Sequence, residues 1–156
     1  MKVSEKGIEL IKKFECCKLY AYRDSVGVLT IGWGHTKGVK AGQAITQQQA
    51  DAFLREDLQE AEKAINVTGV QLSQNQFDAL VSWVFNLGSA KLYKSTMYKY
   101  LKTQRSPMEV CDQMIQWHNA GGKPLLGLKR RRVAEANMYM GSEVYYINKD
   151  EKIVKR

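Results

Sequence analysis

The chain has 156 residues, of which 44% are hydrophobic and 26% are charged, and it carries a formal net charge of +8. This length predicts one domain that can bury a core without disulfide bonds, and the composition excludes a disordered or low-complexity protein. No apolar run approaches the roughly 18 residues of a membrane span, so we expect no stable membrane insertion. The positive charge favours a polyanionic partner. We do not expect nucleic acid, because the basic residues are spread along the chain and no nucleic-acid-binding motif is present.

The N-terminal segment and the cysteines bear on the compartment. Met1 to Phe14 contains no uninterrupted apolar stretch of about seven residues, which differs from a signal peptide. We therefore expect the protein to be made in a cytoplasm and to need another protein's help for any work outside the membrane.

The chain has an odd number of cysteines, and they form no CxxC motif: Cys16, Cys17 and Cys111. They predict reduced thiols and no metal site.

The first predicted helix runs from Ser4 to Phe14, with Ser4 as its N-cap and Gly7 weakening it slightly. Glu15 then falls at or just beyond the last turn, where the helix dipole disfavours a carboxylate. Partial burial would act in the same direction. Both effects favour the protonated form that a general acid needs.

Residues 19–33 are rich in β-branched and aromatic side chains, with turn residues at Asp24, Ser25 and Gly27. This pattern predicts two or three short antiparallel strands. Asp24 follows Glu15 by nine residues, and Thr30 follows Asp24 by six. Because helical neighbours are about three or four residues apart, these three groups meet only if the chain turns back on itself.

Two carboxylates and a hydroxyl that converge on a cleft suit the cleavage of a glycosidic bond. One carboxyl group gives a proton to the leaving oxygen, and the other stays ionised to activate water or to stabilise positive charge. The candidate catalytic residues are therefore Glu15, Asp24 and Thr30.

Helical patterns occupy most of the remaining chain. A long helix is predicted over 46–66 and an apolar central helix over 73–87, and each opens with a capping box. Shorter helices are predicted over 95–102 and 107–117, followed by a plain loop at 119–124 and a last core helix over 129–140. The remaining residues, 142–156, form either a small hairpin or a frayed tail.

These elements predict an α+β protein with a cleft between two lobes. The small antiparallel β lobe covers about 15–45, and the larger helical lobe covers about 66–141 together with the N-terminal helix. The long helix joins the two lobes. The predicted catalytic domain is 1–141, followed by the tail 142–156.

Several ordered motifs are similar to one known family. The spacing of Glu15, Asp24 and Thr30 reproduces a Glu-x8-Asp-x5-Thr pattern, and residues 30–36 read Thr-Ile-Gly-Trp-Gly-His-Thr. Later matches are Phe-Asn-Leu-Gly at 85–88, Trp-His-Asn-Ala-Gly-Gly at 117–122, and Gly127-Leu128 followed by Arg131-Arg132. The chain thereby resembles the phage-type lysozymes, glycoside hydrolase family 24, over about Ser4 to Gly141, and is expected to have a lysozyme-like fold. Cys16 departs from the family, because many relatives have glycine there, and the tail beyond Gly141 runs past the usual family end.

The resemblance implies an N-acetylmuramidase that hydrolyses the β-1,4 bond between N-acetylmuramic acid and N-acetylglucosamine in peptidoglycan without a cofactor. It implies that Glu15 is the general acid and that Asp24 and Thr30 position or activate the attacking water, with inversion at the anomeric carbon. Retention through a nucleophilic Asp24 stays open, because the carboxylate separation decides the outcome. Related lytic transglycosylases lack this aspartate, so Asp24 favours hydrolysis.

The implied biological role is that of an endolysin, which lyses the host cell of a bacteriophage or prophage. We expect a monomer that waits in the host cytoplasm for a holin pore and then acts in the periplasm or cell wall. The rival interpretations are a lytic transglycosylase or chitinase-like enzyme, a peptidoglycan-binding protein without turnover, and a cationic membrane-disrupting protein.

Three further residues are expected to support the site. The family pattern suggests that Arg131 reaches Glu15 and holds it, although an ion pair favours the charged carboxylate and burial would have to balance it. Asn86 is a candidate for lining the cleft and binding an acetamido group of the sugar. His35 is expected to be a structural histidine, hydrogen-bonded beneath the β lobe, rather than a general base.

Overall fold

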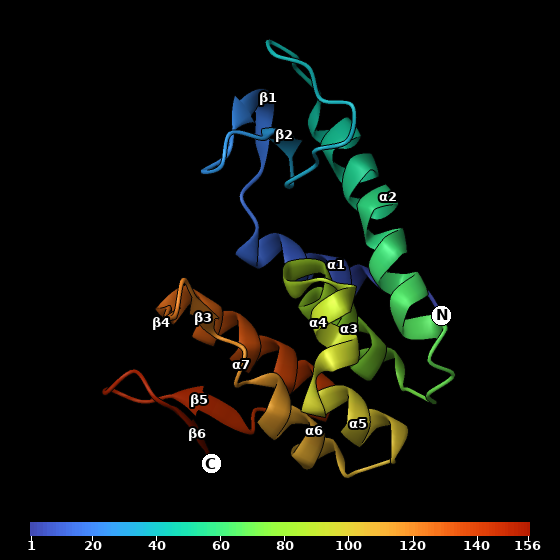
Figure 1. Ribbon diagram of the computed structural model, residues 1–156, viewed down its shortest axis with the longest axis vertical. Coiled ribbons are helices and arrows are strands. Elements are labelled where there is room, and N and C mark those ends of the chain that lie inside the picture. The colour runs from blue at the N-terminus through green and yellow to red at the C-terminus, as the bar shows by residue number, and fades with distance from the viewer.

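The computed structural model describes residues 1–156 and shows a mixed helical and β protein (Figure 1). The elements in chain order are α1 (Glu5–Phe14), β1 (Lys18–Arg23), β2 (Leu29–Gly32), α2 (Gln47–Asn66), α3 (Gln74–Leu87), α4 (Ser89–Lys94), α5 (Thr96–Lys102), α6 (Pro107–Met114), β3 (Asn119–Ala120), β4 (Lys123–Pro124), α7 (Leu126–Met140), β5 (Tyr145–Ile147) and β6 (Ile153–Lys155).

The antiparallel β1–β2 hairpin lies at one end of the molecule, and α2 runs from beside it down to the remaining helices (Figure 1). At the other end, α3 packs against α1, α2 and α7. The predicted α+β class, with a small β lobe, a larger helical lobe and a long connecting helix, is confirmed. No helix has both the length and the apolar character that crossing a bilayer requires.

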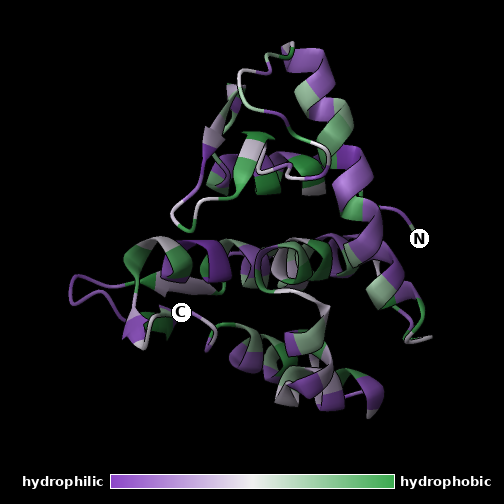
Figure 2. Ribbon diagram, turned by 45° about the horizontal axis from the view of Figure 1, so that its top comes forward, coloured by the Kyte–Doolittle hydropathy of each residue, from purple (hydrophilic) through white to green (hydrophobic).

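The central position of α3 follows from its sequence. Every residue from Phe77 to Val84 is buried, so this helix is covered by other parts of the protein on all sides. The long helix α2 instead alternates hydrophobic and hydrophilic segments, as Figure 2 shows, because only one of its faces meets the core. Trp83 on α3 is fully buried and meets Trp117 edge to face, with ring centroids 5.5 Å apart.

The predicted helix starts are accurate where a side chain caps the first turn. The Thr46 hydroxyl accepts from the backbone N–H of Gln49 and that of Ser73 accepts from Gln76, and both capping boxes are complete. These contacts satisfy backbone donors that a helix leaves open at its N-terminus, so the sequence alone marks the boundary.

Four local predictions were wrong. The helix that begins at Pro107 ends at Met114 rather than at Trp117, and α7 begins at Leu126 rather than at 129. The supposed plain loop at 119–124 contains the β3–β4 hairpin. The short helix α4 was not predicted. Two of these segments start without a side-chain cap, since neither Gly88 before α4 nor Leu125 before α7 makes one.

Gly7 has a different role from the weak point that its helix propensity predicts. A Cβ at this position would lie 2.7 Å from the carboxyl carbon of the fully buried Asp78 on α3. Asp78 accepts hydrogen bonds from the backbone N–H and the hydroxyl of Ser4 and from the Gln74 amide. Glycine therefore allows the start of α1 to approach α3 closely.

The C-terminal residues form a hairpin, in which β5 pairs with β6. The Asn137 side chain on α7 accepts from the backbone N–H groups of Val144 and Tyr145 at 3.0 and 2.8 Å. The Tyr145 hydroxyl donates to Asp112 on α6 at 2.8 Å. These contacts attach the hairpin to the helical end of the molecule.

Candidate active site

Glu15 is the C-cap of α1, and its backbone N–H donates to the Ile11 carbonyl. Its side chain is 24% exposed and its Oε1 accepts from Nη1 of Arg131 at 2.7 Å. Arg131 is 4% exposed and lies 116 positions further along the chain, on α7. The carboxyl group of the predicted general acid is therefore partly accessible to solvent. A buried guanidinium holds it in place.

Arg131 belongs to a buried charge network, which we define as Arg131, Arg132 and Glu135 of α7 together with Ser82 of α3. Glu135 Oε2 accepts from Arg131 Nε at 3.3 Å, from Arg132 Nη2 at 3.2 Å, and from the Ser82 hydroxyl at 2.5 Å. Arg132 Nε and Glu135 Oε1 form an ion pair 2.7 Å apart. Neither of these two atoms makes a hydrogen bond. Burial lowers the pKa of Arg132, the charge of Glu135 raises it, and the charge of Arg131 lowers it, with a net shift downward.

Asp24 lies in the turn between β1 and β2. Its Oδ1 accepts from the backbone N–H groups of Val26 and Val28 at 3.0 and 2.9 Å. We call residues 24–28 the Asp24 turn. The turn is exposed to solvent, since Val26 within it is 80% exposed. The other carboxylate oxygen, Oδ2, accepts no hydrogen bond within the protein, which leaves it free to bind a water molecule or a substrate hydroxyl.

Thr30 lies on β2, opposite Tyr22 of β1 in the strand register. Thr30 is only 4% exposed, and its hydroxyl donates to the carbonyl of Val28 at 3.0 Å. The hydroxyl oxygen keeps its acceptor capacity. Thr30 and Asp24 therefore share one contact residue, Val28, and belong to the same small hairpin.

Tyr22 connects the two carboxylates electrostatically, and sequence reasoning had treated it only as a strand residue. Burial raises the pKa of its hydroxyl first, and the charges of Cys16, Asp24 and Glu15 raise it further. Glu15 and Asp24 thus both contribute to the raised pKa of this hydroxyl. The Lys18 ammonium lies 4.4 Å from the centre of the Tyr22 ring. No sequence signal singled out Tyr22, because an aromatic strand residue is common.

His35 has the contacts of a structural residue. It is 5% exposed, its Nδ1 lies 2.9 Å from Asp57 Oδ2 on α2, and its ring stacks on Phe53 with centroids 4.1 Å apart. Its backbone N–H and carbonyl both pair with Ile31. These contacts attach the segment after β2 to α2.

Asn86 stands near the end of α3 and contacts the charge network. Its Oδ1 accepts from Nη2 of Arg132 at 2.8 Å, and the same guanidinium donates to the Trp117 carbonyl at 3.2 Å. Its amide hydrogens make no bond within the protein. Asn86 is partly exposed, so its amide can serve as a donor to a ligand.

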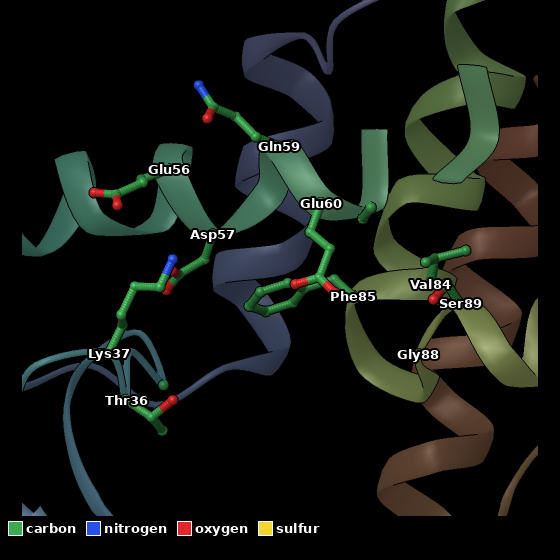
Figure 3. Close-up of a pocket in the computed structure, with 12 residues that line it drawn as sticks. Thr36, Lys37, Glu56, Asp57, Gln59, Glu60, Val84, Phe85, Gly88 and Ser89 are labelled. Carbon is green, nitrogen blue, oxygen red and sulfur yellow. The ribbon is translucent and has the colours of Figure 1, made fainter. Parts of the chain in front are cut away.

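A polar pocket of about 520 Å³ lies between α2, the segment after β2 and the junction of α3 with α4 (Figure 3). Figure 3 shows Asp57 on α2 beside the Lys37 side chain, and Glu60 on the same helix pointing toward Phe85 of α3. None of Glu15, Asp24 and Thr30 lines this pocket. It borders the site through residues adjacent to His35 and Asn86.

The thiols at positions 16, 17 and 111 are all free in the structure. Cys16 is exposed beside Glu15, and Cys17 contacts the Gln47 side chain. Cys111 is fully buried, and burial raises its pKa to about 12. No group of three or more metal-ligating side chains is close enough to hold an ion.

A carboxyl group fixed at a helix end and a second carboxylate in a β turn are the residue types that glycoside hydrolysis uses. The family model Phage lysozyme matches residues 12–135, which is most of the chain. The protein therefore belongs to the phage lysozyme family, and it is an enzyme of the glycoside hydrolase class.

Relatives and solved structures agree with this assignment. An endolysin of Acyrthosiphon pisum secondary endosymbiont phage 1 is 41% identical over 144 residues, which cover 89% of this chain and 98% of the relative. The muramidase domain of SpmX from Asticaccaulis excentricus is 36% identical, with a TM-score of 0.83 over 89% of this chain and 97% of that domain. A variant of the P22 phage lysozyme is 37% identical, with a TM-score of 0.82 over 90% of this chain and 99% of its own.

Proposed function

We propose that the protein hydrolyses the β-1,4 bond between N-acetylmuramic acid and N-acetylglucosamine in peptidoglycan. The observation that carries this proposal is the contrast between Glu15, held by Arg131 at 2.7 Å, and Asp24, which keeps one free carboxylate oxygen. Arg131 fixes the position of the Glu15 carboxyl group although it favours the charged form, and the protonated fraction of Glu15 gives the proton to the leaving oxygen. Asp24, in a solvated turn, orients a water molecule through its free oxygen.

Thr30 assists by its hydroxyl, which donates to the Val28 carbonyl and so presents its acceptor lone pairs to that water. Asn86 donates its amide hydrogens to the carbonyl of a sugar acetamido group, because its oxygen is occupied by Arg132. Arg131 holds Glu15 in place, and His35 fixes the β lobe to α2. We assign this catalytic unit to residues 1–141 and give the hairpin of 142–156 no catalytic part.

The proposal is tested on purified peptidoglycan with the wild-type protein and its Glu15→Gln variant. New reducing ends are counted, and the products are identified by mass. We expect reducing muramic acid ends from the wild type and a loss of about 10²- to 10⁴-fold in the variant. Anhydro-muramic products would instead indicate a lytic transglycosylase, and binding without cleavage would leave a wall-binding protein. The anomeric form of the first product, followed by NMR, distinguishes inversion from retention.

In the cell we propose that the protein is an endolysin that acts as a monomer, remains in the host cytoplasm until a holin opens the membrane, and then attacks the wall. The support is family membership and the endolysin names of its relatives. Expression with and without a holin tests the route. Lysis only with the holin is the expected result, and equal lysis without it would contradict the need for one.

A further inference from the structure

Glu135 is a fully buried carboxylate that no step of the proposed reaction uses. It is surrounded by two arginines and a serine hydroxyl, and its side chain has no exposed surface. Replacing buried ion pairs by apolar groups is often neutral or stabilising, so stability alone gives little reason for such a cluster. The directions in which the two arginines point are more informative.

The two guanidinium groups on Glu135 extend to two different groups of the site. Arg131 Nε binds Glu135, while its Nη1 binds Glu15. Arg132 Nη2 is shared between Glu135 and Asn86. Glu135 is thus the one acceptor common to the arginine that holds the predicted acid and the arginine that holds the predicted sugar-binding amide.

The contact with Arg132 also determines which way the Asn86 amide faces. A guanidinium has donors and no acceptor, so the atom of Asn86 that faces Arg132 must be its oxygen. The amide nitrogen is then left to donate outward. Losing the Arg132 contact would free the amide to rotate, and it would no longer present a fixed donor.

We propose that Glu135 is a positioning residue for the reaction, which orients Arg131 against Glu15 and Arg132 against Asn86. This inference rests on the proposed function, because it assigns Glu135 a role in that same site. Glu135 touches neither substrate nor reacting atoms. Its effect on turnover therefore passes through the two arginines.

The first test is the Glu135→Gln variant, assayed on soluble peptidoglycan fragments for kcat, KM and pH dependence. Small misplacements of a catalytic group cost up to about 100-fold, so we expect kcat to fall between about 10- and 100-fold. We also expect the alkaline limb of the pH–activity profile to move to lower pH. The reason is that the neutral glutamine leaves more positive charge facing Glu15, whose other titratable neighbours are Cys16, next in the chain, and Tyr22, whose pKa it raises.

The matched control is Asp78→Asn, because Asp78 is an equally buried carboxylate that contacts Ser4 and Gln74 and no residue of the site. Both variants are expected to lower the melting temperature. Only Glu135→Gln should change kcat and the pH profile. A purely structural role for Glu135 predicts equal behaviour of the two folded proteins.

A second variant keeps the test valid if Glu135→Gln does not fold. Replacing Arg132 and Glu135 together by methionine removes one charge of each sign and keeps the volume similar, so it is expected to fold. Its kcat should still fall at least about tenfold, because Arg131 keeps only Ser82 as a buried partner and Asn86 has lost its contact with Arg132. Wild-type kcat in either folded variant overturns the inference. Wild-type protein that releases no reducing ends refutes the proposed function itself, and this inference with it.

Discussion

Glu15 at the end of α1 and Asp24 in the β1–β2 turn are held by different kinds of contact. Glu15 depends on a side chain from α7, which in turn depends on Glu135 and Ser82 inside the helical lobe. Asp24 depends on two backbone N–H groups within four residues of itself. The contacts of the buried charge network therefore join distant parts of the chain, whereas those of the Asp24 turn join close neighbours in the sequence.

The difference teaches how stability and activity are divided between the two regions. A change in the buried charge network leaves charges unpaired away from water, which is costly for the whole fold. A change in the Asp24 turn alters a solvated group whose neighbours can still be satisfied by water. We expect the first region to couple folding to catalysis and the second to separate them.

The largest effect on stability is expected from Arg131→Met. The change leaves Glu135 and Glu15 with one charged partner fewer, and breaking a buried ion pair typically costs about 3–5 kcal/mol. Unfolding in denaturant, followed by circular dichroism, measures it. Arg130→Met is the control, because Arg130 is exposed and makes no ion pair. Equal stability of the two variants would contradict the coupling of the network to the fold.

Alkaline pH should weaken the helical lobe through Cys111. Burial raises the pKa of this thiol from 9.0 to about 12, so its neutral form is favoured in the folded state. The associated stability is complete below about pH 9 and is lost as the pH rises towards 12, at up to about 1.4 kcal/mol per pH unit. Tyr139 and Tyr145, whose pKa values are also raised by burial, add to this loss. Cys111→Ala should flatten the decline between pH 9 and 10 in denaturant titrations, and an unchanged slope would count against the thiol.

The same comparison explains what the sequence predicts. Local rules were enough for the capped helix starts and for Asp24 and Gly27 as turn residues, because those structures depend on neighbours in the chain. The family motif pointed to Arg131, and the structure places it on Glu15. Glu135 was missed, because a charged residue three or four positions from two arginines usually marks a solvated helix face. Its burial results from packing of α7 on α3, which no local pattern encodes.

Asp51 should have a smaller effect, because it joins α1 to the segment after β2 at a partly solvated position. Its Oδ1 accepts from the Trp33 indole N–H at 2.8 Å and lies 3.2 Å from the Lys12 ammonium. The Trp33 hydrogen bond lowers its pKa most, burial opposes this, and Gln47 and Lys12 lower it further. A lowered pKa gives stability that is present above the ordinary value of 3.8 and is lost as the pH falls through the lower folded value.

Because Asp51 is 38% exposed, solvent screening should keep this contribution below about 1 kcal/mol. Asp51→Asn should make stability less dependent on pH below 4, in denaturant unfolding at a series of acid pH values. Asp150→Asn serves as the reference, because Asp150 lies in the exposed turn of the β5–β6 hairpin. If the free energy of unfolding depends on acid pH in the same way in both variants, Asp51 does not contribute to the acid stability.

The smallest effect on stability, with a large effect on activity, is expected from Asp24→Asn. Asparagine keeps the oxygen that accepts from Val26 and Val28, and the β5–β6 turn already shows this arrangement, since Asn148 Oδ1 accepts from the N–H groups of Asp150 and Lys152. The free energy of unfolding should change by less than about 0.5 kcal/mol. Release of reducing ends should fall by about 10²- to 10⁴-fold, because the amide cannot take a proton from water.

Asp24→Ala separates the two roles of this side chain. It removes the turn acceptor as well as the charge, so it should lose about 1 kcal/mol of stability in addition to activity. If Asp24→Asn instead unfolds as easily as Arg131→Met, the turn carries tertiary structure and the contrast between the two regions fails. If it keeps full activity, the water is activated elsewhere, and Thr30 or a second carboxylate must be sought for that role. Stable but inactive protein is the one outcome that a local, solvated catalytic carboxylate predicts.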